Sequence, residues 1–144
     1  MGIIRIDEQL CFALHAASRA MTGAYREPLR RLEITYPQYL VLLLLWEQDE
    51  QTISELGDRL RLDSGTLSPL VRRLEVRGLV ERVASTVDER RVHVRLSDDG
   101  RRLGPEIVDV QRCVHENLQL EPAEAAELRR LARTVAGLPD RPPA

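Results

Sequence analysis

Two cysteines, Cys11 and Cys113, are the residues with the clearest capacity for chemistry in this chain. Cys11 lies in the stretch LCFALHAASRAM, and His15 follows it by four positions, which places both side chains on one face of a helix. A thiolate there could attack an oxidant, and the imidazole could assist as a cation or hydrogen-bond donor. A packed structural thiol at the edge of an apolar stripe, beside a histidine without a role, is the alternative.

Metal and enzyme chemistry have less support. A metal site combining both cysteines with His15 and His115 fails, because Cys113 and His115 are two positions apart on a helix and point about 200° apart. A thiol peroxidase using Cys11 with His15 lacks a glycine-rich loop that would stabilise an oxyanion. We therefore expect no enzyme, no catalytic residues, no metal and no cofactor.

A second group of residues could bind DNA. The net charge is −2, but residues 64–95 carry +3 and the remainder carries −5, so positive charge is concentrated in the middle of the chain. Small hydroxyl residues followed by arginine favour a helix whose N-terminal end enters the major groove. These residues are Ser64, Thr66, Ser68 and Arg72. Alternatively, Ser64 only caps the helix and does not contact DNA.

A charged hairpin follows this helix. Residues 79–85 and 92–97 alternate apolar and polar side chains, which predicts two strands joined by a polar tip. An arginine at such a tip can enter a narrow minor groove while an acidic neighbour orients its guanidinium group. The candidates are Asp88, Arg90 and Arg91. An ordinary solvated turn is the alternative.

Helical patterns account for the rest of the chain. Each predicted helix begins at a capping residue or a proline: Asp7, Pro37, Thr52, Ser64 or Ser68, Ser97 and Pro122. The first is expected to reach about Leu32, and the fourth to end at Gly78. The helix from Ser97 is expected to be long and continuous. The last is expected to turn three apolar side chains inward: Leu128, Leu131 and Val135.

This order of elements predicts a mainly α fold with a small β-wing. A winged helix-turn-helix at 36–97 is flanked by N- and C-terminal dimerisation helices at 7–35 and 98–137, all within a single domain over 1–144. Alone, the outer helices would leave an apolar stripe exposed, so we expect a homodimer. No secretory signal or membrane span is evident, which favours a cytoplasmic protein whose two thiols are free or redox-active.

The segment LRLDSGTLSPLVRRLEVRGLVERVASTVDERRVHVRLSDDGR resembles the recognition helix and wing of MarR-type transcriptional regulators. Within that family, LCFALHAASRAM, Tyr25 and ITYPQYLVLLLLWE are similar to the branch that senses organic hydroperoxides. The resemblance covers about residues 7–136. It implies a dimeric repressor on inverted-repeat operator DNA, contacted through the helix and wing residues named above.

The same resemblance makes Cys11 the residue that organic hydroperoxides oxidise, with Tyr25 and Tyr36 donating hydrogen bonds to its thiolate. Tyr25 lies 14 residues further along the same helix, a rise of about 21 Å, so this contact requires a partner subunit. His15 stands where the family is expected to have a tyrosine. Whether a third hydrogen-bond donor to the thiolate is present therefore stays open.

Cys113 resembles the resolving thiol of the two-cysteine members of this branch. The sulfenic acid on Cys11 would then condense with the partner subunit's Cys113 to form a disulfide. A passive Cys113 is the alternative for this residue. At the level of function, the alternative is a MarR-type repressor with two passive cysteines, released by a small phenolic or acidic ligand in the dimer cleft.

Overall fold

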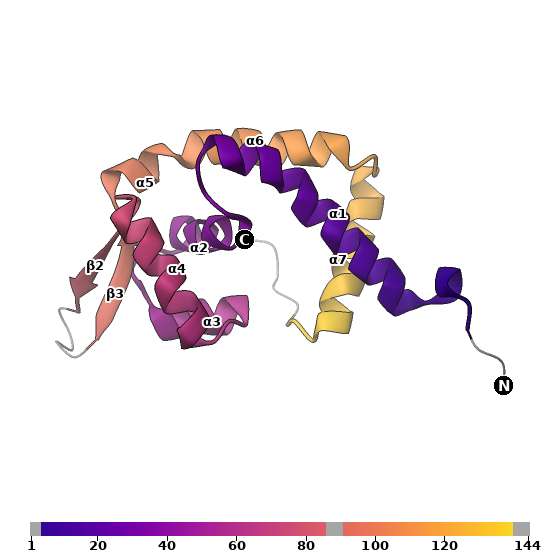
Figure 1. Ribbon diagram of the computed structural model, residues 1–144, viewed down its shortest axis with the longest axis horizontal. Helices are drawn as coiled ribbons and strands as arrows, with labels where there is room; N and C mark the ends of the chain where they lie inside the picture. Colours follow the sequence, from indigo (N-terminus) through magenta and orange to yellow (C-terminus); the bar gives the residue numbers. More distant parts are fainter. Residues whose placement is uncertain (1–3, 86–90, 140–144) are drawn as a thin grey trace.

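The computed structural model describes residues 4–85 and 91–139. A short 3-10 helix, η1 (Ile6–Glu8), precedes the other elements. In chain order these are α1 (Leu10–Arg31), α2 (Tyr36–Glu47), β1 (Gln51–Thr52), α3 (Ile53–Leu60), α4 (Ser64–Val76), β2 (Val80–Ala84), β3 (Val92–Leu96), α5 (Asp98–Arg102), α6 (Gly104–Asn117) and α7 (Pro122–Ala136). Figure 1 shows α2, α3, α4 and the sheet grouped together, with α1 and α6 extending away from them.

The central helix of this group is α2. Thr35 caps it and accepts from the backbone N–H of Gln38 while the Gln38 side chain accepts from the Thr35 N–H, and Pro37 lies in the first turn. Its buried apolar side chains are Tyr39, Val41, Leu42, Leu44 and Leu45. The prediction of a core helix here is confirmed.

The helix-turn-helix consists of α3, a tight turn and α4. The predicted capping box of Thr52 and Glu55 opens α3. Arg61 ends it in the left-handed conformation, with φ of 55°. Asp63 then caps α4, so the helix begins at Ser64 and Pro69 lies inside it. Ser64 is therefore the first helical residue, and the interpretation of Ser64 as the cap is wrong.

Gly78 follows α4 with φ of 70°, a conformation that glycine adopts without steric cost, as expected for the residue that ends this helix. The hairpin of β2 and β3 is confirmed, with Val80 opposite Leu96 and Ala84 opposite Val92. A third strand, β1, pairs with β3 on its other side. Its two residues are too few to show an alternating pattern in the sequence.

Two predicted helix boundaries are wrong. The first α-helix begins at Leu10, because Asp7 lies in η1 and bonds to Arg5 at 3.4 Å instead of capping. Ser97 caps only the short α5, and the expected continuous helix is broken at Leu103. Pro105 has no N–H to donate to the preceding turn, which accounts for the break.

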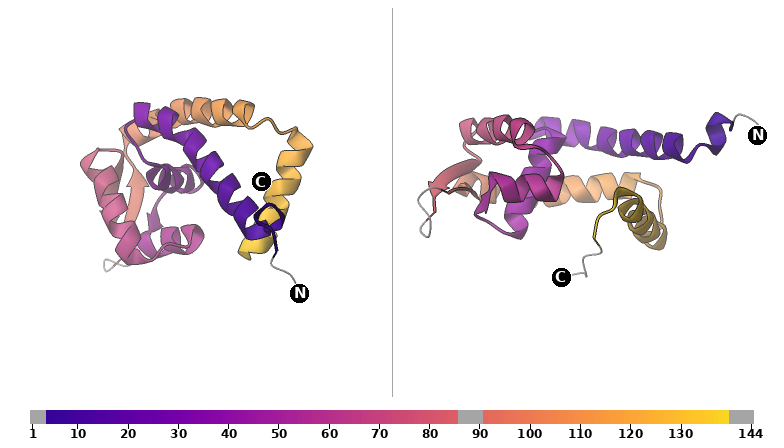
Figure 2. Two further views of the ribbon diagram at one scale, coloured as in Figure 1. Left: turned by 45° about the vertical axis from the view of Figure 1, so that its right-hand side comes forward. Right: turned by 90° about the horizontal axis from the view of Figure 1, so that it is seen from below.

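Large parts of α1 and α7 pack against no other element among the described residues of the single chain. Leu29 is the buried residue of α1, whereas Leu10 is 66% exposed. The three side chains of α7 expected to turn inward are also exposed: Leu128, Leu131 and Val135. In the right-hand view of Figure 2 the N-terminal part of α1 projects beyond the other elements, and α7 lies apart from it. No helix among the described residues is long and apolar enough to cross a membrane.

Candidate functional site

Three of the predicted DNA-contacting residues of α4 lie near its N-terminal end, and Arg72 lies beyond the midpoint of the helix. Ser64, Thr66 and Arg72 are exposed, and Ser68 is half-buried. The hydroxyl of Thr66 donates to Asp63 at 3.0 Å, and its backbone N–H donates to the same carboxylate at 2.8 Å. These hydrogen bonds hold the pKa of Asp63 below its ordinary value. Thr66 therefore stabilises the start of the helix and keeps its oxygen lone pairs free to accept.

The arginines around α4 fall into two groups. Arg82 pairs with Glu75 at 3.3 Å, and Arg95 pairs with Glu81 at 3.0 Å, so these cations are partly neutralised. Arg72 and Arg73 form no ion pair with any residue in the described part of the chain. Both lie exposed on α4, where they are free to bind phosphate oxygens.

The wing is described only at its base. Asp88 and Arg90 lie outside the described residues, so their predicted roles stay predictions. Arg91 is exposed immediately before β3, and its backbone carbonyl accepts from Ser85 at 2.8 Å across the hairpin. Together with Ser54 and Glu55 at the start of α3, Arg91 lines a hollow of about 450 Å³.

Both cysteines are free and exposed in the single chain. Cys11 lies in the first turn of α1, and His15 is exposed one turn later. Cys113 lies in the last turns of α6, where the side-chain amide of Asn117 donates to its carbonyl oxygen at 2.7 Å. The same nitrogen lies 3.6 Å from the sulfur of Cys113. Exposure makes both thiols accessible to small oxidants and to other protein surfaces.

The three tyrosines of the chain form one cluster. The ring centres of Tyr25 and Tyr36 are 5.2 Å apart, and Tyr39 lies 5.2 Å from Tyr25 and 5.8 Å from Tyr36. Tyr39 was not among the predicted site residues. Its spacing of three from Tyr36 on a helix was the signal that could have found it.

The cluster keeps its outer phenols protonated. Burial raises the pKa of Tyr25 to about 12, and the charge interaction and hydrogen bond with Tyr39 add to this effect. Burial, followed by interaction with Tyr25, raises the pKa of Tyr36 as well. Both groups are therefore hydrogen-bond donors throughout the physiological pH range.

Cys11 and Tyr25 are not brought together within one chain. Both lie in the same continuous helix, and 14 residues of α-helix rise about 21 Å. One chain thus presents a free thiol near one end of α1 and a phenol cluster toward the other. No group of three or more metal-binding side chains occurs among residues 4–85 and 91–139.

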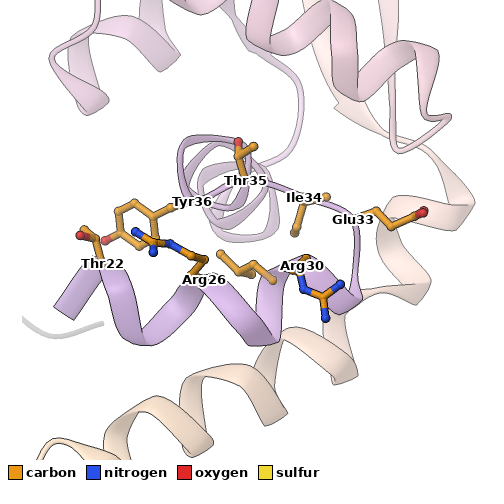
Figure 3. Close-up of a pocket in the computed structure, with 8 residues that line it drawn as sticks. Thr22, Arg26, Arg30, Glu33, Ile34, Thr35 and Tyr36 are labelled. Carbon is orange, nitrogen blue, oxygen red and sulfur yellow. The ribbon is translucent and has the colours of Figure 1, made fainter. Parts of the chain in front are cut away.

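A cleft of about 680 Å³ lies where the C-terminal half of α1 meets the start of α2. Figure 3 shows Tyr36 reaching from α2 toward Thr22 and Arg26 of α1, with Ile34 and Thr35 on the connecting segment. Arg30 also lines the cleft but bonds to Glu27 at 2.8 Å, whereas Arg26 has no ion pair within the described ranges. The cleft thus combines an apolar floor with a cation and a phenol.

Residues 34–92 match the MarR family. The organic hydroperoxide resistance transcriptional regulator of Bacillus subtilis is 44% identical over 128 residues, covering 89% of this chain and 85% of that protein. Among solved structures, reduced AbfR bound to DNA is 34% identical with a TM-score of 0.78, covering 92% of this chain and 91% of that one.

A second structure of the same relative, disulfide-formed AbfR, is also 34% identical, with a TM-score of 0.67, and covers 92% of this chain and 88% of its own. AbfR is a protein of Staphylococcus epidermidis. These relatives are regulators, not enzymes, and the similarity extends through the outer helices as well as the helix-turn-helix. The chain belongs to the MarR family of DNA-binding transcriptional regulators and resembles its organic hydroperoxide resistance branch.

Proposed function

We propose that this regulator is a dimeric repressor that leaves its operator when an organic hydroperoxide oxidises Cys11. The observation that carries the proposal is the separation of a free thiol and a phenol cluster along α1. If two α1 helices related by a two-fold axis run antiparallel, each Cys11 faces the partner subunit's Tyr25 and Tyr36. Each sensing site then combines Cys11 of one chain with the tyrosines of the other chain.

The exposed apolar side chains supply the dimer interface. Leu10 and Phe12 of α1 and Leu131 and Val135 of α7 are all between 47% and 66% exposed in one chain. Large apolar side chains left exposed on the outer helices of one chain are typical of a surface that a second subunit covers. The dimerisation segments are accordingly 7–35 and 98–137, and the helix-turn-helix with its wing occupies 36–97.

The sensing chemistry has two steps. The Cys11 thiolate attacks the distal oxygen of the hydroperoxide; the O–O bond breaks, the sulfur is oxidised to a sulfenic acid, and the leaving alkoxide takes a proton to become an alcohol. The thiolate of the partner subunit's Cys113 then attacks the sulfenic sulfur, forming a disulfide and releasing the oxygen as water. The similarity to AbfR, solved in both a reduced DNA-bound form and a disulfide form, supports this sequence.

Phenolic donors make the first step faster. Hydrogen bonds from Tyr25 and Tyr36 favour the charged thiolate of Cys11, which increases its reactive fraction. His15 lies one turn from Cys11 and supplies a further donor, or a positive charge when protonated. The disulfide requires Cα atoms within about 7 Å, so α6 must shift if the reduced thiols are further apart.

On DNA, the two α4 helices of the dimer occupy successive major grooves of an inverted repeat, and the wings reach the minor groove. The proposed contacts are Ser64, Thr66, Ser68 and Arg72 from the helix and Asp88, Arg90 and Arg91 from the wing. A regulator that binds operator DNA works where the DNA lies, in the cytoplasm.

The cleft between α1 and α2 favours a second candidate function. Arg26 and Tyr36 beside an apolar floor suit a small phenolic or acidic molecule, whose carboxylate would pair with the free guanidinium group. In this alternative the ligand releases the repressor and both cysteines are passive.

DNA-release assays separate the candidates. An operator is first selected from a random DNA pool, and binding is measured by fluorescence anisotropy with and without one equivalent of cumene hydroperoxide. We expect at least tenfold weaker binding for the oxidised wild type, full reversal by dithiothreitol, and no change for Cys11→Ser. Release of Cys11→Ser by the peroxide contradicts redox sensing. Release of that variant by benzoate or salicylate favours the ligand-responsive alternative.

A further inference from the structure

Asn117 lies one helical turn after Cys113 on α6, and its side chain contacts that cysteine twice. The amide nitrogen donates to the backbone carbonyl oxygen of Cys113 at 2.7 Å and lies 3.6 Å from the sulfur. Side chains of a helix lean toward its N-terminal end, so residue i+4 covers residue i. Asn117 therefore extends over the turn that carries the thiol.

The carbonyl contact determines which atom of the amide faces the cysteine. A carbonyl oxygen can only accept, so the Asn117 atom that lies 2.7 Å from it is the nitrogen and not the amide oxygen. An NH₂ group carries two hydrogens, so one bonds to the carbonyl oxygen while the other is available to the sulfur. The first bond thus holds a donor beside the thiol.

The other groups around Cys113 on its own helix disfavour a thiolate. Cys113 lies about one turn from the C-terminal end of α6, where unpaired carbonyl groups carry partial negative charge. Glu116, three positions later, is exposed on the same side of the helix, and Asp109, four positions earlier, pairs with Arg112 at 2.8 Å. Among the described residues, Asn117 is the donor whose hydrogen bond reaches this sulfur.

We propose that Asn117 is a positioning residue for the resolving step: it holds the Cys113 sulfur and donates to the thiolate as the thiolate attacks the sulfenic acid on the partner subunit's Cys11. In that step the S–S bond forms, the S–O bond breaks, and the oxygen leaves as hydroxide, which takes a proton to become water. The donor favours the charged form of the thiol, which is the form that reacts.

This inference rests on the proposed function for the role of Cys113, but the contact itself lies within one helix. If α6 shifts to bring the two sulfurs together, Asn117 moves with Cys113 and the contact is kept. The donor is therefore in place both before and during the attack.

The first test measures the reactivity of Cys113 by itself. Every protein carries Cys11→Ser, so that Cys113 is the only thiol, and alkylation by iodoacetamide is followed by mass spectrometry. Asn117→Leu keeps the approximate size of the side chain and removes the donor. We expect alkylation to be about fivefold slower at neutral pH, the effect of losing one net hydrogen bond, and no slower at about pH 10.5, where the thiol is ionised without help. A merely structural role would slow alkylation at both pH values.

Two further substitutions separate the donor from other effects. Asn117→Asp keeps the shape of the side chain, but its carboxylate only accepts and adds a negative charge, so it should slow alkylation at least as much as Asn117→Leu. His115→Leu changes the same turn of α6 but points about 200° away from Cys113, and it should leave the rate unchanged. Slow alkylation in Asn117→Asp with a normal rate in Asn117→Leu overturns the proposal, because the effect is then charge repulsion alone.

The second test measures the resolving step with both cysteines present. After one equivalent of cumene hydroperoxide is added, the sulfenic acid on Cys11 is trapped with dimedone at successive times and the disulfide is measured on a non-reducing gel. We expect Asn117→Leu to leave the oxidation of Cys11 unchanged and to slow disulfide formation about fivefold. Gel filtration of each variant confirms that the dimer is intact.

The outcomes distinguish this inference from the function on which it rests. A wild type that forms the disulfide, with an equal or faster rate in Asn117→Leu, overturns the role of Asn117 and leaves the pairing of Cys11 with Cys113 standing. A wild type that forms no disulfide shows that this pairing is wrong, and the resolving role of Asn117 falls with it.

Discussion

The guanidinium group of Arg61 donates a 2.7 Å hydrogen bond to the carbonyl oxygen of Gly137, the residue that ends α7. A second bond of the same length reaches Ala136. Arg61 lies in the turn between α3 and α4, so this fork joins the DNA-binding unit to the end of an outer helix. Carbonyl groups at a helix C-terminus have no partner within the helix, and a cation is a favourable one.

Replacing Arg61 with alanine should therefore loosen the last turn of α7. Alanine retains the Cβ atom at the left-handed position, so the change removes the fork without altering the backbone preference. We expect several-fold faster amide hydrogen exchange at the last turn of α7 and little change in α2. Arg129→Ala, on an exposed face of α7, is the matched control. Equal exchange in the two variants would show that the fork has no effect on α7.

Alkaline pH should destabilise the protein through Tyr25. Its pKa is about 12 in the folded chain and about 10 when unfolded, so its contribution to stability is complete below pH 10 and is lost as pH rises toward 12. Because the chain's three tyrosines all lie in the cluster, tyrosinate absorbance reports on the cluster alone. We expect a high-pH step that Tyr25→Phe removes. Titration of all three near pH 10 in the folded protein would contradict the buried cluster.

Gly100 should tolerate no side chain. A Cβ atom there would lie 2.1 Å from the backbone oxygen of Leu79, which cannot move without shifting β2. We expect Gly100→Ala to lower the free energy of unfolding by about 2 kcal/mol or more. Gly104→Ala, four residues later, meets only the Trp46 nitrogen at 3.8 Å and should leave stability equal or higher. Urea unfolding at a single protein concentration compares the two, and similar midpoints would refute the packing of α5 on Leu79.

Arg72 should contribute to DNA affinity through charge. It forms no ion pair among the described residues, so no protein carboxylate competes with phosphate. We expect Arg72→Ala to weaken operator binding about tenfold and, if it contacts one phosphate per subunit, to reduce the salt dependence by about two for the dimer. Arg129→Ala should change neither quantity. An unchanged salt dependence with weaker binding would point to a base contact instead.

Much of the fold could be predicted because local signals agreed with the tertiary structure. The capping box at Thr52, the glycine at 78 and the alternating strands around the wing each determine a local conformation through a single physical rule. The helix boundaries that were predicted wrongly lie where one local interaction competes with another. Asp7 bonds to Arg5 instead of capping, and Pro105 interrupts a helix whose apolar stripe continues past it. A two-residue strand such as β1 exists only because β3 lies beside it.

The parts of the candidate site that depend on single residues or on one helix could be predicted from the sequence. The sequence contains both cysteines, Tyr25 and Tyr36, and the helix rise alone shows that Cys11 and Tyr25 are far apart in one chain. The hydrogen bonds that Gln111 and Arg61 donate to other helices join residues 72 or more positions apart, and no periodicity encodes them. These contacts depend on how α6 and α7 are placed relative to α2 and to the turn between α3 and α4.

In the proposed mechanism, Cys11 of one subunit and Cys113 of the other form a single redox site. The most direct measurement mixes Cys11→Ser and Cys113→Ser chains after mild unfolding, lets them reassociate, and adds one equivalent of cumene hydroperoxide. We predict a covalent dimer on a non-reducing gel, with a Cys11–Cys113 crosslinked peptide by mass spectrometry, in the mixture and in neither variant alone. Monomers in the mixture, together with monomeric oxidised wild type, would contradict this pairing of the two cysteines.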